Sequence, residues 1–150
     1  MKKHFTATVY IVSRIDDKYK VLLHCHKKLG IWIAIGGHIE RNENPAEAVL
    51  REAKEETNLE IKILSSNALI KNKNVSELPK MMALIEEKVP AYNNEKAHLH
   101  MDCIYFAICQ NPKQIKMDGE YRWFSKKDLQ KGQLEEEVFI LAKRALDYYA

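Results

Sequence analysis

The chain has 150 residues, of which 46% are hydrophobic and 30% charged, and its formal net charge at pH 7 is +3. This is the composition of a globular protein, and the charge is too small to indicate a nucleic-acid-binding protein. No apolar run reaches the ~18 residues that a membrane-spanning helix needs. We therefore expect a single domain over residues 1–150 without a membrane partner, and we do not expect nucleic acid as a partner.

The cysteines and the N-terminal residues bear on the cellular compartment. Cys25, Cys103 and Cys109 form no CxxC pair and lie in apolar, strand-like stretches. Residues 1–10 contain no small-residue cleavage site of the kind that ends a secretory signal. These features predict free, buried thiols in a reducing compartment, and hence a cytoplasmic location.

The first part of the chain is predicted to form three strands. Alternating apolar and polar residues predict strands over 4–15 and 19–25, joined by a short polar turn. The apolar run 31–35 predicts a third strand, which the adjacent Gly36 and Gly37 are expected to end.

A helix is predicted over Pro45–Thr57, because both of its ends carry recognisable signals. Asn44 can cap its N-terminus, Pro45 suits the first helical position, and Glu47 stands where a capping box requires it. Asn58 can end the helix, since asparagine tolerates the left-handed conformation better than most residues. Its sheet-facing residues are expected to be Ala46, Val49, Leu50 and Ala53.

The rest of the chain is predicted to contain four strands and a closing helix. The strands are expected over 59–70, 80–89, 98–108 and 120–124, and the helix over 134–149; Ser125 is expected to cap a turn after the last strand. The predicted order β-β-β-α-β-β-β-β-α indicates an α+β fold with strands of mixed direction.

Three carboxylates share one face of the predicted helix. Glu52, Glu55 and Glu56 fall within about 100° of one another on a helical wheel, with no basic side chain expected between them. Like charges at this spacing destabilise a helix by a few tenths of a kcal/mol per pair, so the cluster suggests a bound cation. Carboxylate oxygens favour Mg²⁺, with Mn²⁺ as the alternative, and such ions complete their shells with substrate phosphates. A solvated acidic face is the alternative explanation.

The charge distribution agrees with a phosphate substrate. Residues 40–60 hold seven acidic and three basic side chains, a net charge of −4, so the remainder of the chain carries +7. An acidic segment within a basic protein suits a cation held between carboxylates and a polyanion.

The segment Gly36–Leu59 reads GGHIERNENPAEAVLREAKEETNL and resembles the signature of the Nudix hydrolases, G-x5-E-x7-R-E-U-x-E-E-x-G-U, where U is a bulky aliphatic residue. The matching positions are Gly37, Glu43, Arg51, Glu52, Glu55, Glu56 and Leu59. There are three departures: Asn58 replaces the final glycine, Ala53 replaces a larger aliphatic residue, and Ile35 stands where many relatives carry proline.

The resemblance implies a Nudix-type α/β/α sandwich with a mixed central sheet. It also implies water attack on phosphorus in a nucleoside di- or triphosphate or a related nucleotide-linked diphosphate. The implied metal ligands are Glu52, Glu55, Glu56 and the carbonyl of Gly36. The implied structural residues of the motif are Gly37, Glu43 and Asn58. Arg51 is placed among the catalytic residues because it is expected to pair with Glu43 and orient the loop.

The general base and the substrate-binding residues stay open at this point. Glu55 is one candidate base, and Glu120, outside the motif, is another, with Asp118 and Glu95 as weaker choices. The substrate-binding candidates are His24, His26 and His38, each of which could instead be an ordinary surface residue. His98, His100 and Asp102 share one strand face and could touch substrate or metal, although a plain polar face would look the same.

Two other functions compete with hydrolysis. The chain could be a catalytically weak Nudix domain that senses a nucleotide, or a small interaction protein with an acidic helix. Relatives specific for ADP-ribose or dinucleoside polyphosphates often carry a proline or a tyrosine downstream of the motif, and residues 60–77 contain neither. The expected partner is therefore a nucleotide of undefined type, bound by a monomer or a homodimer.

Overall fold

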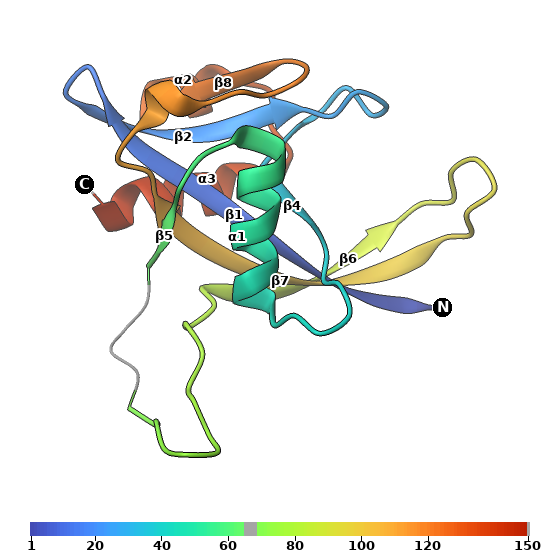
Figure 1. The fold of residues 1–150 in the computed structure, drawn as a ribbon. Helices are drawn as coiled ribbons and strands as arrows, with labels where there is room; N and C mark the ends of the chain where they lie inside the picture. The colour runs from blue at the N-terminus through green and yellow to red at the C-terminus, as the bar shows by residue number, and fades with distance from the viewer. Residues whose placement is uncertain (65–68, 150) are drawn as a thin grey trace.

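A computed structural model describes residues 1–64 and 69–149, and within them one mixed sheet is flanked by helices (Figure 1). The elements in chain order are β1 (Lys3–Ile15), β2 (Lys18–Cys25), β3 (Trp32–Ile33), β4 (Ile35–His38), α1 (Pro45–Thr57), β5 (Lys62–Ile63), β6 (Ala83–Val89), β7 (His98–Ile108), the short 3-10 helix η1 (Pro112–Gln114), β8 (Tyr121–Phe124), α2 (Lys126–Lys131) and α3 (Glu136–Tyr149).

Strand β1 is the centre of the sheet and gives it its mixed character. One edge of β1 pairs antiparallel with β2 near its C-terminal end and with β4 near its N-terminal end. The other edge runs parallel to β7, from Lys3 opposite Leu99 to Val12 opposite Ile108. Strand β6 then pairs antiparallel with β7, and β8 with β2. The predicted α+β class with mixed strand directions is therefore confirmed.

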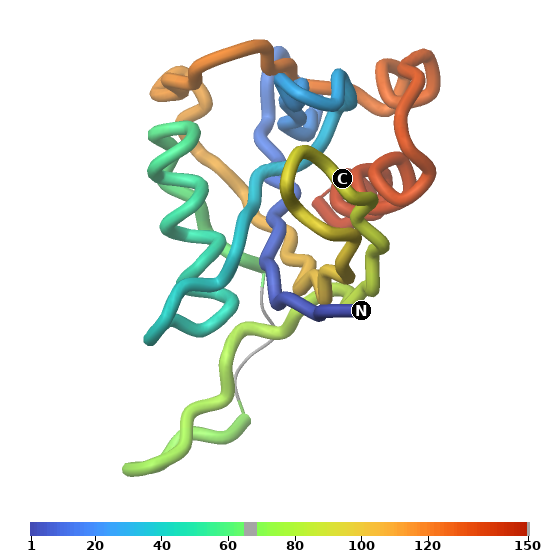
Figure 2. The backbone as a smooth tube through the Cα atoms, turned by 90° about the vertical axis from the view of Figure 1, so that its right-hand side faces the viewer, coloured from blue at the N-terminus to red at the C-terminus, as the bar shows by residue number. Residues whose placement is uncertain are grey.

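The two faces of the sheet are covered by different helices. Figure 2 shows α1 on one side of the sheet and α3 on the other. Because side chains alternate along a strand, β1 contributes to both layers. Ala7, Val9 and Ile11 pack in the cluster under α1, whereas Tyr10 and Val12 pack in the cluster under α3. This is the α/β/α sandwich that the sequence predicts.

Helix α1 has the ends that the sequence predicts. The Asn44 side chain accepts the backbone N–H of Glu47, and the Glu47 carboxylate accepts the backbone N–H of Asn44, which completes a capping box. Asn58 lies in the left-handed region at φ 62°, and its N–H bonds the carbonyl of Lys54. The prediction that Leu50 packs on the sheet is wrong, because its side chain is 43% exposed.

The glycine pair does not end a strand as predicted. It lies inside β4, where Gly37 is opposite Ala7 and Gly36 is opposite Thr8. The apolar run 31–35 is instead split between β3 and β4, with Ala34 between them. Glycine suits both positions because β1 leaves no room for a side chain at Gly36 and the Glu52 carboxylate leaves none at Gly37.

Other predicted boundaries were too generous. Residues 65–68, within the strand expected over 59–70, lie outside the described residues, and only Lys62–Ile63 of that range is assigned as strand β5. Strand β6 begins at Ala83 rather than at residue 80, and α3 begins at Glu136 rather than at 134. Ser125 caps the short helix α2 together with Asp128, where only a turn was expected.

The remaining expectations from composition concern membranes and thiols. No helix within residues 1–64 and 69–149 is long and apolar enough to span a membrane. Cys103 and Cys109 are buried free thiols, as predicted, whereas Cys25 is a free thiol that is only half-buried.

Candidate active site

Helix α1 presents its three carboxylates in very different environments. The Glu52 side chain is 14% exposed and that of Glu55 is 61% exposed. Glu56 is half-buried, and its Oε2 atom is buried without a hydrogen-bond partner. An unpaired buried carboxylate oxygen is costly, so this atom calls for a partner that the protein itself does not supply.

The electrostatics of Glu56 point the same way. The pKa of Glu56 is raised to about 8 by burial, followed by the negative charge of Glu52, a hydrogen bond with the Glu52 side chain and the negative charge of Glu55. A divalent cation would reverse these effects, and an all-oxygen donor set fits a hard ion. With the side chains as they stand, no three His, Cys, Asp or Glu residues of the described chain form a group that could hold a metal ion. The residues therefore fit a cation by their chemistry, and the carboxylates would have to turn to share it.

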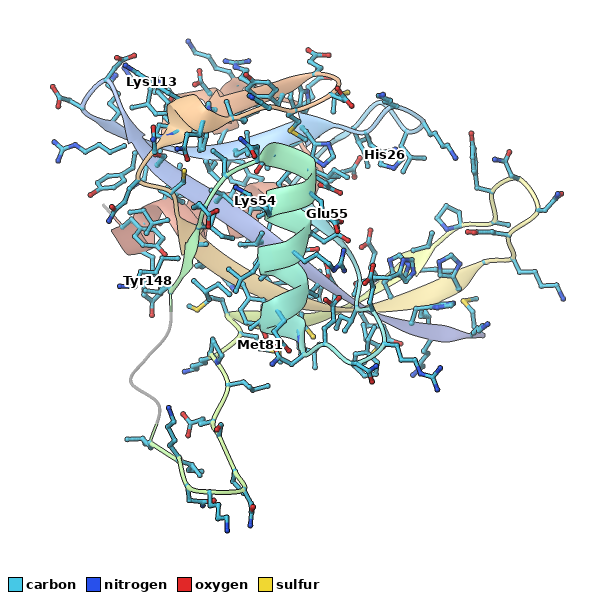
Figure 3. All side chains as sticks on the ribbon, in the orientation of Figure 1. His26, Lys54, Glu55, Met81, Lys113 and Tyr148 are labelled. Carbon is cyan, nitrogen blue, oxygen red and sulfur yellow. The ribbon has the colours of Figure 1, made fainter. Side chains whose placement is uncertain are left out.

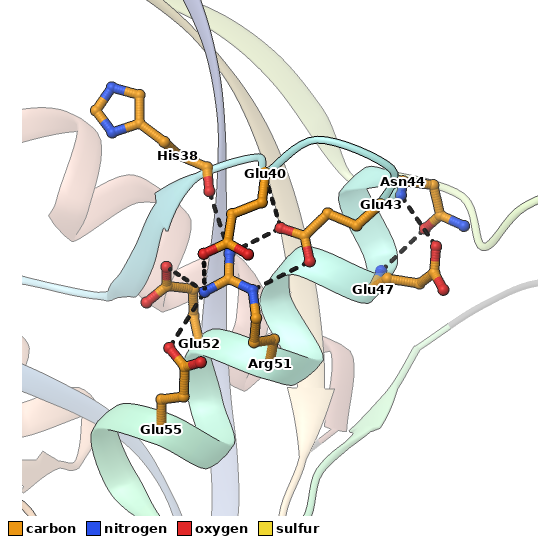
Figure 4. Close-up of polar contacts among 8 residues, drawn as sticks. All are labelled: His38, Glu40, Glu43, Asn44, Glu47, Arg51, Glu52 and Glu55. Carbon is orange, nitrogen blue, oxygen red and sulfur yellow. Dashed lines mark hydrogen bonds and ion pairs between the residues drawn. The ribbon is translucent and has the colours of Figure 1, made fainter.

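The Arg51 guanidinium is at the centre of the ionic contacts around the motif (Figure 4). It donates two bonds to Glu43, at 2.7 and 3.0 Å, which is the pairing that the sequence predicts. One of its nitrogens also contacts Glu52 at 3.0 Å and Glu55 at 3.2 Å. The expectation of no basic side chain between the carboxylates is therefore wrong for this pair.

Two further contacts complete the arginine's environment. Arg51 donates to the backbone carbonyl of His38 at 3.2 Å and lies 3.5 Å from the Glu40 carboxylate. The hydrogen bond from Arg51 lowers the pKa of Glu43, and the same contact raises the pKa of Arg51. Arg51 thus ties the end of β4 and the following loop to α1. Glu40, which the sequence analysis did not single out, belongs to this network.

The glycine pair allows β4 to pass very close to its neighbours. A Cβ on Gly37 would lie 2.5 Å from Oε1 of Glu52, so a larger residue there would displace that carboxylate. A Cβ on Gly36 would overlap the backbone carbonyl oxygen of Ala7 on β1. Both glycines are needed because of space rather than because of an unusual φ.

A cavity of about 680 Å³ lies beside the acidic face of α1. Its lining residues are His24, Cys25, His26, Lys27, Lys28, Ile33, Gly36, Glu55, Glu56, Met117 and Asp118. In Figure 3 His26 and Glu55 lie on the same side of α1, and Lys54 projects away from them. The cavity lining therefore combines the α1 carboxylates Glu55 and Glu56 with Asp118 and with the basic side chains among residues 24–28. Lys27 and Lys28 were missed by the sequence analysis, although their position directly after His24 and His26 was a usable signal.

The two histidines of this cavity differ in their surroundings. Burial lowers the pKa of His24, although a hydrogen bond to the backbone of Ala34 opposes this shift, so the neutral ring is favoured. The Nδ1 atom of His26 accepts the backbone N–H groups of Lys28 and Leu29, both at 3.3 Å, and so shapes the loop that carries the lysines.

The structure separates the candidate acids outside the motif. Asp118 lines the cavity, whereas the Glu120 side chain is exposed and is not among the lining residues. Glu120 instead accepts the backbone N–H of Cys25 through its own carbonyl, at 2.9 Å. Glu95 lies on the β6–β7 hairpin, in a bridge with Tyr92, and does not line the cavity either.

A second cavity, of about 330 Å³, meets the first one at His26, Ile33 and Gly36. Its lining includes His38 and His100 at one end and apolar residues from β3, β6 and α3. His38 is exposed and lies here, and it is absent from the lining of the acidic cavity. The structure thus places the three predicted substrate-binding histidines around two connected cavities.

Asp102 is a nearly buried acidic group in the lining of the second cavity. It accepts the hydroxyls of Thr6 and Thr8 at 2.9–3.0 Å, and it is 7% exposed. Burial raises the pKa of Asp102, although the two hydroxyls oppose this shift. Burial and the negative charge of Asp102 also raise the pKa of Glu87 on β6. These acids give the cavity polar groups for recognising a ligand with hydrogen-bond donors.

The NUDIX domain family model matches residues 4–144. A NUDIX-family hydrolase from Clostridium perfringens is 29% identical over 100% of both chains, with a TM-score of 0.79. The Ap4A hydrolase of C. elegans is 19% identical over 100% of both chains, with a TM-score of 0.66.

A third similar structure is the NUDIX domain of Shewanella oneidensis NrtR, solved in complex with ADP ribose. It is 20% identical and has a TM-score of 0.60, covering 100% of this chain and 90% of that one. No match is found among curated proteins. The family match extends from the first strand into the last helix and includes the acidic face of α1, so the chain belongs to the NUDIX domain family, the Nudix hydrolases.

Proposed function

We propose that residues 1–150 act as one Nudix domain that hydrolyses a diphosphate linkage with the help of Mg²⁺, or alternatively Mn²⁺. The single observation that carries this proposal is the buried, unpartnered Oε2 of Glu56, beside a cavity that Glu55 and Glu56 line together with basic side chains. A cation and a phosphate chain together would satisfy both the carboxylates and the basic side chains.

Glu52, Glu55 and Glu56 would hold the metal, with the carbonyl of Gly36 as a further ligand. Bound there, the metal would neutralise phosphate charge and lower the pKa of the attacking water. Arg51 acts as a positioning residue, because it fixes Glu52 and Glu55 against the Glu43 loop.

The chain's own residues would bind the phosphates and remove a proton. Lys27 and Lys28 supply positive charge to the cavity that Glu55 also lines, and His24 contributes an uncharged ring to its lining. Glu55 is the more suitable general base, because it lines the cavity and is exposed to water. Asp118 is the second choice, and Glu120 becomes weaker because its side chain lies outside the cavity lining.

The non-reacting part of the substrate would occupy the second cavity. That cavity joins the first at Gly36, so a nucleotide could extend from the carboxylates to Asp102 without leaving the protein. Its mixture of apolar walls and acidic groups suits a nucleoside better than a further phosphate. The substrate class is therefore a nucleoside di- or triphosphate or a related nucleotide-linked diphosphate.

The test is a panel of nucleotides and nucleotide-linked diphosphates assayed with Mg²⁺. Glu55→Gln and Glu56→Gln are each expected to lower kcat by about 100-fold or more. Glu60→Gln is the matched control, since this exposed glutamate follows the same helix and contacts only Lys54 among the ion pairs of the described residues. No turnover of any compound, or equal loss in all three variants, would contradict the proposal.

The same panel distinguishes a nucleotide sensor from an enzyme. Calorimetry on the same compounds would show tight binding without turnover if the domain were a sensor. The fold likeness to the NrtR domain that was solved with ADP ribose makes this outcome worth measuring.

A further inference from the structure

Four of the six histidines gather at one end of the sheet, away from α1. They are His4 on β1, His38 at the end of β4, and His98 and His100 at the start of β7. The strand pairing explains this meeting, since His4 is opposite His100 and His38 is opposite Thr6. Alternation along each strand then directs all four side chains to the same face of the sheet. We refer to these residues as the histidine cluster.

The spacing within the histidine cluster is that of metal-bound imidazoles. Ring centroids are 4.9 Å apart for His98–His100 and 5.1 Å for His4–His98. They are 5.3 Å apart for His38–His100 and 5.6 Å for His4–His38. With metal–nitrogen bonds of about 2.0–2.1 Å in tetrahedral geometry, ring centroids would be about 5 Å apart and ligand nitrogens about 3.3 Å apart. The Nε2 atoms of His98 and His100 are 3.1 Å apart.

The protonation of His98 also suits a metal ligand. Its Nδ1 lies 3.0 Å from the carbonyl oxygen of Lys96, which can only accept, so Nδ1 carries the proton. The Nε2 lone pair of a neutral ring therefore points at His100. A backbone carbonyl that fixes one ring nitrogen while the other faces a metal is the usual arrangement around histidine ligands.

Solvent can reach the histidine cluster. Its candidate ligands are imidazoles, whereas those on α1 are carboxylates. His38 is exposed and the other three residues are half-buried, and His38 and His100 also line the second cavity. Since no three side chains of the described residues already form a group that could hold a metal, His4 or His38 must rotate to complete the site. Both lie close to strand ends, where such a rotation meets little packing.

We propose that His98 and His100, completed by His4 or His38, bind one ion of a transition metal that prefers imidazole, with Zn²⁺ as the representative. Imidazoles select Zn²⁺, Cu²⁺ or Ni²⁺ over Mg²⁺, so this site and the carboxylates would take different metals. A bound ion would join the start of β7 either to the start of β1 through His4 or to the end of β4 through His38.

The experiment is calorimetric titration of the metal-free protein with Zn²⁺. One Zn²⁺ per chain is expected, with affinity weakened by roughly 100-fold or more in the double variant His98→Ala/His100→Ala. Two controls separate other sources of binding: His24→Ala/His26→Ala removes the histidines of the acidic cavity, and Glu56→Gln removes a carboxylate. Both controls are expected to keep the site. Absence of Zn²⁺ binding, or equal binding by the His98→Ala/His100→Ala protein, would overturn the proposal.

A measurement on the unmodified protein keeps the test valid if that variant does not fold. NMR of the histidine ring nitrogens, followed during Zn²⁺ addition, is expected to shift the His98 and His100 Nε2 signals and to move the ring proton of His100 to Nδ1. Shifts confined to His24 and His26 would refute the site. Neither readout depends on hydrolysis, so failure here would leave the proposed function unaffected.

Discussion

Burial and like charge both act against ionisation of Glu56. Its pKa of about 8 in the folded protein lies above its ordinary value of 4.5. A raised pKa means that the group contributes stability below about 4.5, and that this stability is lost as the pH rises through about 8. Without a divalent cation, the native protein should therefore lose stability across this range.

Glu56→Gln tests that conclusion, since glutamine imitates the protonated acid. In metal-free buffer, the variant should become more stable than wild type as the pH rises, by about 1–2 kcal/mol near pH 8 after allowance for solvent screening. Urea unfolding at several pH values measures the difference. Adding Mg²⁺ should shrink or reverse it, whereas a difference that does not vary with pH would contradict the pKa shift.

The two adjacent glycines should respond differently to substitution by alanine. At Gly37 the new methyl group would meet the flexible end of Glu52, so activity should fall about tenfold or more with little change in stability. At Gly36 it would meet the backbone of β1, which cannot move aside, so unfolding should become easier by roughly 2 kcal/mol or more. Thermal unfolding and kcat, measured on both variants, separate the two effects. Equal behaviour of the two would contradict this assignment.

At the scale of the element, the stability of α1 depends on the residues that cap its two ends. Asn58 takes the place of the motif's last glycine at φ 62°, and its side chain also donates to the carbonyl of Gln114 at 3.1 Å. Asn58→Ala should cost about 1 kcal/mol, because alanine tolerates this conformation poorly. The free energy of unfolding of Asn58→Gly should stay within about 0.5 kcal/mol of wild type. Glycine adopts the left-handed conformation readily, and this gain offsets the loss of the side-chain hydrogen bond to Gln114. Urea unfolding provides the free energy of unfolding of both variants. A large loss of stability in Asn58→Gly together with no loss in Asn58→Ala would refute the role of the left-handed conformation.

The loop after β2 is the element that brings positive charge to the site. Lys27→Gln/Lys28→Gln should raise KM for a nucleotide several-fold and leave kcat within about twofold, because these side chains bind phosphate rather than react. Lys71→Gln/Lys73→Gln, on the exposed segment after β5, is the control of equal charge. Steady-state kinetics at low and high salt measure both variants. An unchanged KM for the first would remove the loop from the substrate site.

At the scale of the whole molecule, local signals in the sequence predicted helices better than strand ends. The Asn44–Glu47 capping box and Asn58 placed α1 at its observed bounds, because each acts within a few residues. The glycine pair was misread, since what keeps it inside β4 is the close approach of Ala7 and Thr8 from β1. Strand β5 was over-predicted for a related reason: strand length depends on the neighbouring strand, which periodicity does not reveal.

Local sequence patterns likewise identified some parts of the candidate site and missed others. The helix spacing identified the carboxylates, and the motif identified the Arg51–Glu43 pair. Contacts between distant segments were not predictable, such as Asp102 with Thr6 and Thr8 or the meeting of His4 with His100. These contacts depend on the parallel pairing of β1 with β7, which a sequence pattern does not specify.

The parallel pairing of β1 with β7 also affects when the protein can fold. Strand β1 must wait for β7, which follows it by about ninety residues, so the centre of the sheet is closed by contacts of long sequence separation. Such contacts slow folding, because the intervening chain must be confined before they stabilise anything. During synthesis, the acidic helix would emerge well before the strand that completes the sheet beneath it. Folding of this protein is therefore expected to be a late, cooperative event, and chains that end before Ile108 should not acquire the site at all.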